Sequence, residues 1–175
     1  MFKNKNIDKI KNIDKMKKVF LLFSILISVI VVQAQDISDN ALGLRFGDND
    51  GLGAEISYQK SLSESTRLEA GLAWRSRKHY NALKITATHQ WVFDLEGLDG
   101  VNWYVGAGGG LGSWSIKDGY AGDDGTFLFL AGDIGIEYKF DIPLQIALDF
   151  RPELGFADYN NDLGLDIALA VRYTF

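Results

Sequence analysis

The sequence has no cysteine, and it has only two prolines and two histidines among its 175 residues. The absence of cysteine excludes a disulfide scaffold, a thiolate metal site, a cysteine nucleophile and an acylated-cysteine anchor. Two histidines are too few for a metal centre built on several imidazoles. The net charge of −5 argues against nucleic acid as a partner, because such binding depends on basic side chains. The length accommodates a single domain.

A segment near the N-terminus has the features of an export signal. Lys17 and Lys18 precede an apolar run at 19–32, which is followed by Ala34 and Gln35. This order predicts a secretory signal peptide over 1–34, cleaved between Ala34 and Gln35, with Met16 as the true start. A retained anchor is the alternative, although the run is short for a transmembrane helix.

Removal of the predicted signal peptide makes the protein strongly acidic. Residues 1–34 hold seven lysines and two aspartates, so residues 35–175 carry 11 basic and 21 acidic side chains, a net charge of −10. The predicted mature protein is therefore exported, acidic and independent of disulfides.

Alternation with a period of two residues dominates the chain after residue 40 and predicts eight β-strands. The last segment is the clearest, with apolar residues at 163, 165, 167, 169, 171, 173 and 175. Short connectors at 61–65, 95–100 and 141–143 fall on one side, and the longer ones at 113–126 and 155–162 fall on the other. This asymmetry is typical of an outer-membrane barrel. Pro152 predicts a bulge or the outer end of the seventh strand.

Three features indicate that the apolar faces point outward. The opposite face of the fifth segment carries bare glycines at 106, 108, 110 and 112, which leave room inside a narrow barrel but make a poor water-facing surface. Aromatic residues gather at strand ends, as in the girdles of membrane barrels. The chain ends in Val171-Arg172-Tyr173-Thr174-Phe175, an alternating strand with a terminal phenylalanine.

With these residues, and with the segments 104–110 and 135–140, the chain resembles the small outer-membrane β-barrel family, similar to the eight-stranded OmpA and OmpX transmembrane barrels. The resemblance implies an all-β, eight-stranded antiparallel up-and-down transmembrane β-barrel over residues 35–175. It also implies recognition by the barrel-assembly machinery through an assembly signal in the last strand, at Leu169, Val171, Tyr173 and Phe175.

In this orientation a cluster of charged side chains points into the barrel. Its members are Arg45, Glu55, Glu69, Arg75, Lys84, Asp133, Glu137, Lys139, Asp149, Arg151, Asp166 and Arg172. Six are acidic and six are basic, which allows complete pairing, and buried charges require it. A structural plug of salt bridges is the favoured interpretation, and a gated ion or proton path is the alternative. A wide pore is excluded because eight strands enclose little more than their own side chains.

Other candidate sites give weaker signals. His89 lies among outward apolar positions, where a lipid-modifying enzyme would need a serine and an acid beside it. His79 lies near Arg75, Arg77 and Lys78 in an outer connector that is either a solvated rim or a contact for lipopolysaccharide phosphates. Aspartates make the outer loops acidic, at 48, 50, 118, 123, 124, 158 and 162. The segment 48–51 is interpreted as a hairpin turn rather than a calcium loop.

Together these observations predict a small integral outer-membrane barrel with no cofactor, no metal and no catalytic residues. We expect a non-enzymatic role, either structural in the envelope or binding a surface ligand through short acidic loops. The alternatives are a narrow gated conduit, a membrane-embedded enzyme that modifies lipid A, and a soluble lipocalin-like carrier. The expected partners are outer-membrane lipid, including lipopolysaccharide, and the barrel-assembly machinery.

Overall fold

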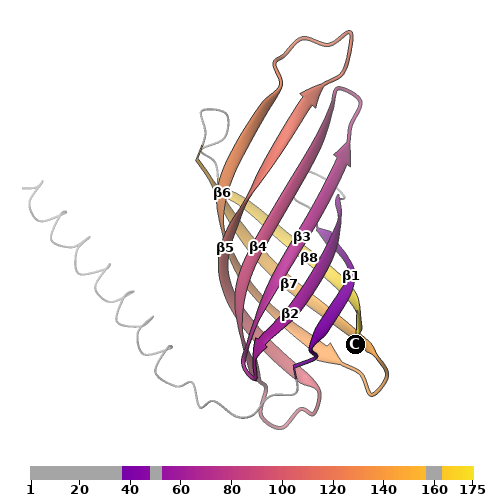
Figure 1. Ribbon diagram of the computed structural model, residues 1–175, viewed down its shortest axis with the longest axis vertical. Coiled ribbons are helices and arrows are strands. Elements are labelled where there is room, and N and C mark those ends of the chain that lie inside the picture. The colour runs from indigo at the N-terminus through magenta and orange to yellow at the C-terminus, as the bar shows by residue number, and fades with distance from the viewer. Residues whose placement is uncertain (1–36, 48–52, 157–162) are drawn as a thin grey trace, which may run out of the picture. The chain divides into compact units, whose positions relative to one another are not determined.

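Eight antiparallel strands form one closed barrel (Figure 1). The computed structural model describes residues 37–47, 53–156 and 163–175. The strands are β1 (Asn40–Gly47), β2 (Gly53–Ser63), β3 (Thr66–Ser76), β4 (Tyr80–Asp94), β5 (Val101–Ile116), β6 (Gly125–Lys139), β7 (Leu144–Gly155) and β8 (Leu163–Thr174). Each strand pairs with the next in the chain, so the predicted up-and-down fold is confirmed.

The first and last strands close the barrel. The register of β1 with β8 runs from Ala41 opposite Thr174 to Gly47 opposite Ala168. Beyond it, Asn40 and Phe175 exchange two backbone hydrogen bonds of 2.9 Å. Because closure satisfies the backbone groups of both terminal strands, neither strand presents a free edge.

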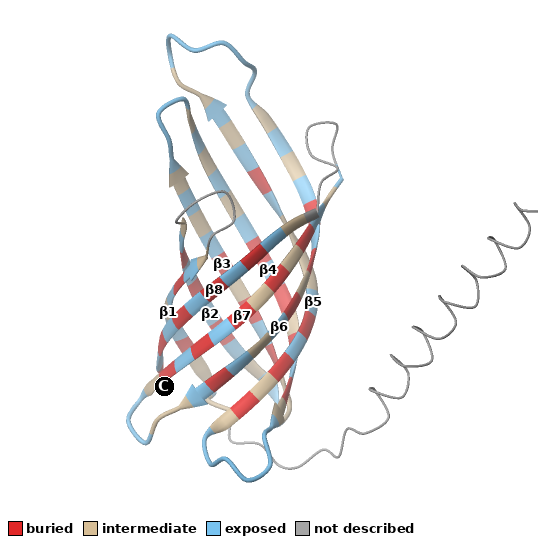
Figure 2. Cartoon of the chain, turned by 180° about the vertical axis from the view of Figure 1, so that it is seen from behind, coloured by how far each residue is buried: buried red, intermediate tan, exposed pale blue. Residues whose placement is uncertain are grey.

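Alternating exposure along each strand separates an apolar outer face from a polar interior (Figure 2). On β8, Leu165 and Ile167 are exposed at 57% and 62%, whereas Asp166 and Ala168 are each exposed at 2%. A period of two residues places successive side chains on opposite faces of a strand. The predicted direction of the apolar faces is therefore confirmed.

The strands are unequal in length. β4, β5 and β6 have 15, 16 and 15 residues, and their paired ends extend beyond the other strands (Figure 1). The connector predicted at 113–126 is therefore shorter than expected, because β5 and β6 stay paired as far as Trp114 opposite Gly125. The indole of Trp114 lies where a Cβ on Gly125 would be, and its ring centroid is 6.0 Å from that of Phe127. This packing supports β5 and β6 near their outer ends, beyond the last outward-facing leucines, Leu111 and Leu128.

Pro152 lies inside a strand rather than at its end or in a bulge, so that prediction was wrong. β7 continues to Gly155, and its pairing with β6 keeps one register on both sides of the proline. The ladder is interrupted only opposite Gly132 and Asp133. Proline has no N–H to donate, and Gly132 leaves space for its ring, because a Cβ there would lie 3.2 Å from the proline Cγ. The strand therefore loses local hydrogen bonding without a shift in register.

Inward-facing glycines make room for larger side chains on neighbouring strands. A Cβ on Gly110 would collide with the ring of Phe129, and one on Gly112 would collide with the ring of Phe127. A Cβ on Gly71 would collide with the carboxylate of Glu55. The predicted role of the glycine face of β5 as space for neighbours is confirmed at Gly110 and Gly112, and Gly71 on β3 has the same role. The described residues contain no helix with the length and apolarity needed to cross a membrane.

Candidate functional site: a charged network in the barrel interior

The interior of the barrel is polar, unlike the core of a water-soluble protein. The buried polar and charged residues are Arg45, Glu55, Ser57, Gln59, Arg67, Glu69, Thr86, Thr88, Gln90, Asn102, Asp133, Glu137, Gln145, Asp149, Arg151, Glu153, Asp166, Arg172 and Thr174. The buried hydrophobic residues in the described ranges are fewer, and half or more of them are alanines. A buried charge is costly unless it is paired and hydrogen-bonded, so the arrangement of partners determines the stability of this interior.

The structure brings most of the predicted charged cluster together. Nine of its members are buried: Arg45, Glu55, Glu69, Asp133, Glu137, Asp149, Arg151, Asp166 and Arg172. Arg75, Lys84 and Lys139 are half-buried. The predicted balance of six acids and six bases does not describe the buried set. In the described ranges it contains seven carboxylates and four arginines, so several carboxylates share a guanidinium or accept hydrogen bonds from neutral side chains.

Two buried charged residues were missed by sequence reasoning. Arg67 follows a Ser-Glu-Ser-Thr segment that was interpreted as a connector, although it lies two residues before Glu69 on the same face of β3. Glu153 follows Pro152, where the strand was expected to end, and it lies two residues after Arg151. Extending the two-residue period by one step in each strand would have found both.

Arg45 of β1 lies among the acids of three other strands. Its guanidinium binds Asp149 on β7, and its Nη1 donates to Asp166 on β8 at 2.6 Å. Its Nη1 also lies 3.9 Å from the carboxylate of Glu55 on β2. Arg45 and Asp166 both lie near the seam between β1 and β8, so this pair reinforces the closure of the barrel.

Glu69 on β3 is the centre of the network. Its carboxylate accepts hydrogen bonds from Arg172 at 2.9 Å and from Arg151 at 3.2 Å. It also accepts from Gln59 at 2.7 Å and from Gln90 at 3.0 Å. With side-chain exposure of 1% or less, Glu69, Arg151 and Arg172 are isolated from solvent. Arg151 also binds Glu55 at 2.9 Å.

A second group occupies the end of the barrel at which β8 ends. Arg67 on β3 donates to both carboxylate oxygens of Glu137 on β6, at 2.8 and 2.7 Å. Its Nε donates to Gln90 at 2.6 Å, and its guanidinium carbon lies 4.8 Å from the ring centroid of Tyr104. Gln145 on β7 donates to Glu137 at 2.6 Å. A bidentate pair with an aromatic ring against it fixes the side chains in position.

The opposite half of the interior is more aromatic. Lys84 on β4 binds Glu153 on β7 at 2.7 Å, and its ammonium lies 5.4 Å from the ring centroid of Phe129. The rings of Phe127 and Phe129 are 5.9 Å apart and lie over the glycines of β5. The interior is therefore filled by ion pairs in one part and by aromatic rings in another.

Both histidines that the sequence analysis considered, His89 as a possible catalytic base and His79 in the basic outer connector, pack against aromatic rings. On the outer face, His89 pairs with Leu68 on β3 and Ala107 on β5, and its ring packs edge-on against Trp91 at 4.7 Å. His79 in the β3–β4 turn packs against Tyr120 at 4.4 Å. Within the part of the chain that the structure describes, no group of three or more histidine and carboxylate side chains is arranged to hold a metal.

The predicted assembly signal lies on the outer face of β8. Leu169, Val171, Tyr173 and Phe175 are exposed at 52%, 39%, 58% and 58%. The rings of Tyr173 and Phe175 stack with centroids 5.9 Å apart. The predicted cleavage site at Ala34 and Gln35, the turn at 48–51 and the aspartates at 158 and 162 lie outside the described residues.

Comparison with solved structures shows the fold. The N-terminal β-barrel domain of Pseudomonas aeruginosa OprF superposes with a TM-score of 0.62 and 15% identity, covering 82% of this chain and 100% of that domain. Neisserial surface protein A superposes with a TM-score of 0.58 and 17% identity, covering 78% of this chain and 94% of that one. The outer membrane enzyme PagL superposes with a TM-score of 0.50 and 14% identity, covering 78% of this chain and 99% of that one. Neither a known family nor a curated protein matches the sequence.

The chain thus has the fold of the small eight-stranded outer-membrane β-barrels, and the predicted resemblance is confirmed at the level of fold. Its structural relatives include both a surface protein and an enzyme, so the fold by itself does not assign an activity.

Proposed function

We propose that the protein is an integral barrel of the outer membrane of a Gram-negative cell, exported by the predicted signal peptide. Its proposed role is non-enzymatic, either structural in the envelope or binding a surface ligand at its outer loops. The observation that carries this proposal is the inverted polarity, with charged side chains buried and large apolar side chains exposed around the barrel.

The exposed apolar residues form a continuous band around the barrel, and exposing such a band to water would be unfavourable. Leu148, Ile136 and Leu169 are neighbours across β6, β7 and β8, and each is 45% or more exposed. Exposed apolar patches of this extent are rare on soluble monomers and mark contact with a membrane or a partner. A soluble lipocalin-like carrier needs an apolar interior, and this interior is charged.

Aromatic rings at one end of the barrel support the same placement. Phe93 stacks on Trp103 with centroids 4.6 Å apart, and Tyr138 packs edge-on against Phe140 at 4.6 Å. These pairs lie beside the short β4–β5 and β6–β7 connectors. Amphipathic rings favour the headgroup level of a bilayer, so this end is proposed to face the periplasm.

The interior contacts favour a barrel filled by ion pairs across its interior over a conduit. Arg67 joins β3 to β6, Arg45 joins β1 to β7, and Arg151 joins β7 to β2 and β3. Each contact links strands that are not neighbours in the sheet, so it crosses the interior. A conducting path would require hydrated space where these side chains meet.

The surroundings of His89 support a non-enzymatic role. Acyl transfer or hydrolysis needs a nucleophile and an orienting acid within hydrogen-bond reach of the base. The side chains on either side of His89 in the register are leucine and alanine, and Trp91 covers its ring. Insertion is proposed to use the exposed side of β8 together with Phe175, which follows the strand.

The electrophoretic mobility of the protein in isolated outer membranes tests the proposal. A folded membrane barrel resists detergent, so unboiled and boiled samples should migrate at different positions. A protein recovered in the soluble periplasmic fraction, with one mobility in both samples, would overturn the proposed location. An acyl-chain release assay on lipid A, comparing wild type with His89→Ala, would overturn the non-enzymatic role if it detected His89-dependent product.

A further inference from the structure

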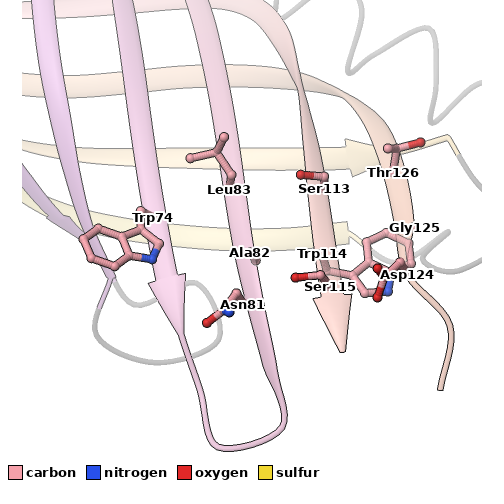
Figure 3. A pocket seen from close by; sticks show the side chains of 10 residues that line it. All are labelled: Trp74, Asn81, Ala82, Leu83, Ser113, Trp114, Ser115, Asp124, Gly125 and Thr126. Carbon is pink, nitrogen blue, oxygen red and sulfur yellow. The ribbon is translucent and has the colours of Figure 1, made fainter. Parts of the chain in front are cut away.

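A hollow lies on the outer face of the barrel where the long strands leave the apolar band. Its volume is about 550 Å³, and its lining includes Trp74, Asn81, Leu83, Ser113, Ser115 and Thr126 (Figure 3). We refer to it as the rim hollow. Its size is within the range of small-ligand sites, and none of its lining residues belongs to the interior charged network.

The strand register explains the position of the rim hollow. One row across β3 to β6 consists of Leu72, Ile85, Leu111 and Leu128. The next row toward the loops consists of Trp74, Leu83, Ser113 and Thr126, and the following one of Ser76, Asn81 and Ser115. The outer face thus changes from aliphatic to hydroxyl side chains within two residues on β5 and β6, and reaches Ser76 and Asn81 four residues on along β3 and β4.

The hollow itself results from a difference in side-chain size. Ser113 and Thr126 are small and outward-facing, and they lie in the same row as Trp74 and Leu83. Trp74 is 73% exposed, which makes it the most exposed of the large hydrophobic residues in the described ranges. Figure 3 shows it at one side of the hollow, with Asn81 and Leu83 on the adjacent strand.

This combination of groups matches a saccharide. An exposed indole offers a flat apolar face to the C–H side of a sugar ring, while hydroxyl and amide groups bind the ring hydroxyls. The amide oxygen of Asn81 accepts from Ser76 at 2.8 Å, which leaves its nitrogen to donate. Asp124 also lines the hollow, and one of its carboxylate oxygens accepts from the backbone N–H of Ile116 at 2.7 Å.

Basic residues next to the hollow match an anionic substituent on that saccharide. The ammonium of Lys117 donates to the hydroxyl of Ser76 at 3.1 Å, and that hydroxyl donates to Asn81. Ser76 therefore links Lys117 to Asn81 at the edge of the hollow. The backbone N–H of Lys117 donates to the carbonyl of His79, so Lys117 and the basic β3–β4 turn lie together. An ammonium has three donors, and phosphate is a suitable acceptor for the remaining two.

We propose that the rim hollow binds the phosphorylated sugar headgroup of an outer-leaflet glycolipid, with its acyl chains along Leu111 and Leu128. These two leucines are 54% and 61% exposed directly below the hollow. A soluble sugar has no acyl chain to contact this row of leucines, and a phospholipid such as phosphatidylglycerol has no sugar ring to pack on the indole of Trp74. The proposal rests on the membrane placement argued above.

Titration of the full barrel in phosphatidylcholine nanodiscs with rough lipopolysaccharide tests the proposal, with bound glycolipid counted by native mass spectrometry. Trp74→Ala removes the indole platform and Ser113→Leu fills the hollow, so each should reduce glycolipid affinity at least tenfold. Trp91→Ala is the matched control at the other end of the barrel and should bind as wild type. Unchanged affinity in both rim variants would overturn the site.

A second comparison tests the phosphate contact. Lys117→Ala should weaken binding of the phosphorylated glycolipid severalfold and leave binding of the dephosphorylated form unchanged. Equal binding of phosphatidylglycerol, or of the free core oligosaccharide, would overturn the assignment to a glycolipid. Every variant is first checked for the mobility shift on boiling. A wild-type barrel that shows the shift but binds no glycolipid overturns this inference alone, whereas absence of the shift overturns the membrane placement as well.

Discussion

Arg67 and Glu137 form a two-pronged ion pair across the barrel, with hydrogen bonds of 2.8 and 2.7 Å between strands that are not neighbours. The side chains of both residues are less than 5% exposed. Contacts of this kind hold opposite walls of the barrel at a fixed separation, and each buried charge depends on its partner, because an unpaired buried charge is costly.

Loss of one partner should be more harmful than loss of both. Arg67→Met leaves Glu137 as a buried carboxylate without its cation and should lower the free energy of unfolding by about 3–5 kcal/mol. The double variant Arg67→Met/Glu137→Met should recover much of that loss, because both charges are gone. Urea unfolding in detergent micelles, followed by tryptophan fluorescence, measures the difference. Equal stability of the single and double variants would contradict this account of the pair.

Glu69 should be the most sensitive acid in the interior. Glu69→Gln keeps the size of the side chain but removes the charge that Arg151 and Arg172 share, so we expect a loss of about 3 kcal/mol or more in the same assay. Glu64→Gln in the exposed β2–β3 turn is the matched control and should change stability by about 0.5 kcal/mol or less. Similar effects at the two positions would mean that the network does not stabilise the barrel.

A cation placed on the outer face distinguishes a lipid environment from water. Leu148→Arg lies between Ile136 and Leu169 in the apolar band and should reduce stability in bilayers by about 2–4 kcal/mol. Leu62→Arg in the β2–β3 hairpin, which is also exposed, should cost about 1 kcal/mol or less. Refolding yield and urea unfolding in vesicles test both. If Leu148→Arg had no effect, the band would not face lipid.

The glycine face should resist larger side chains. Gly110→Ala places a methyl group against the ring of Phe129 and against the backbone of β4, and should cost about 1–3 kcal/mol. Adding Phe129→Leu should restore part of the loss by freeing space. The melting temperature in detergent checks both variants, and no recovery in the double variant would show that the backbone contact dominates.

The filled interior should block ion flow. Wild-type protein inserted in a planar bilayer should show no stepwise currents of porin size, because side chains of four buried arginines and seven carboxylates occupy the centre. A mobility shift on boiling in the same preparation confirms insertion. Reproducible single-channel steps from inserted protein would favour the gated conduit instead.

Much of the fold follows from local patterns in the sequence. The alternation in β8 and the side of each connector predict the strand number and order, because a two-residue period and a hairpin are local properties. Arg67 and Glu153 were missed for a local reason, since a serine-rich segment and a proline were interpreted as strand ends. The long β5–β6 hairpin was underestimated because Ser113 and Ser115 are not apolar, although tertiary packing of Trp114 keeps their strand paired.

The sequence by itself therefore determined that this protein is a barrel with a charged side and an apolar side, since the residue type at every second position carries that information. Only the tertiary structure decided which charges meet. Arg45 finds Asp149 and Asp166, 104 and 121 residues away, through the register with which the closed sheet brings β1, β7 and β8 together. The rim hollow has the same origin, because it exists only where one register aligns Trp74 and Leu83 with Ser113 and Thr126.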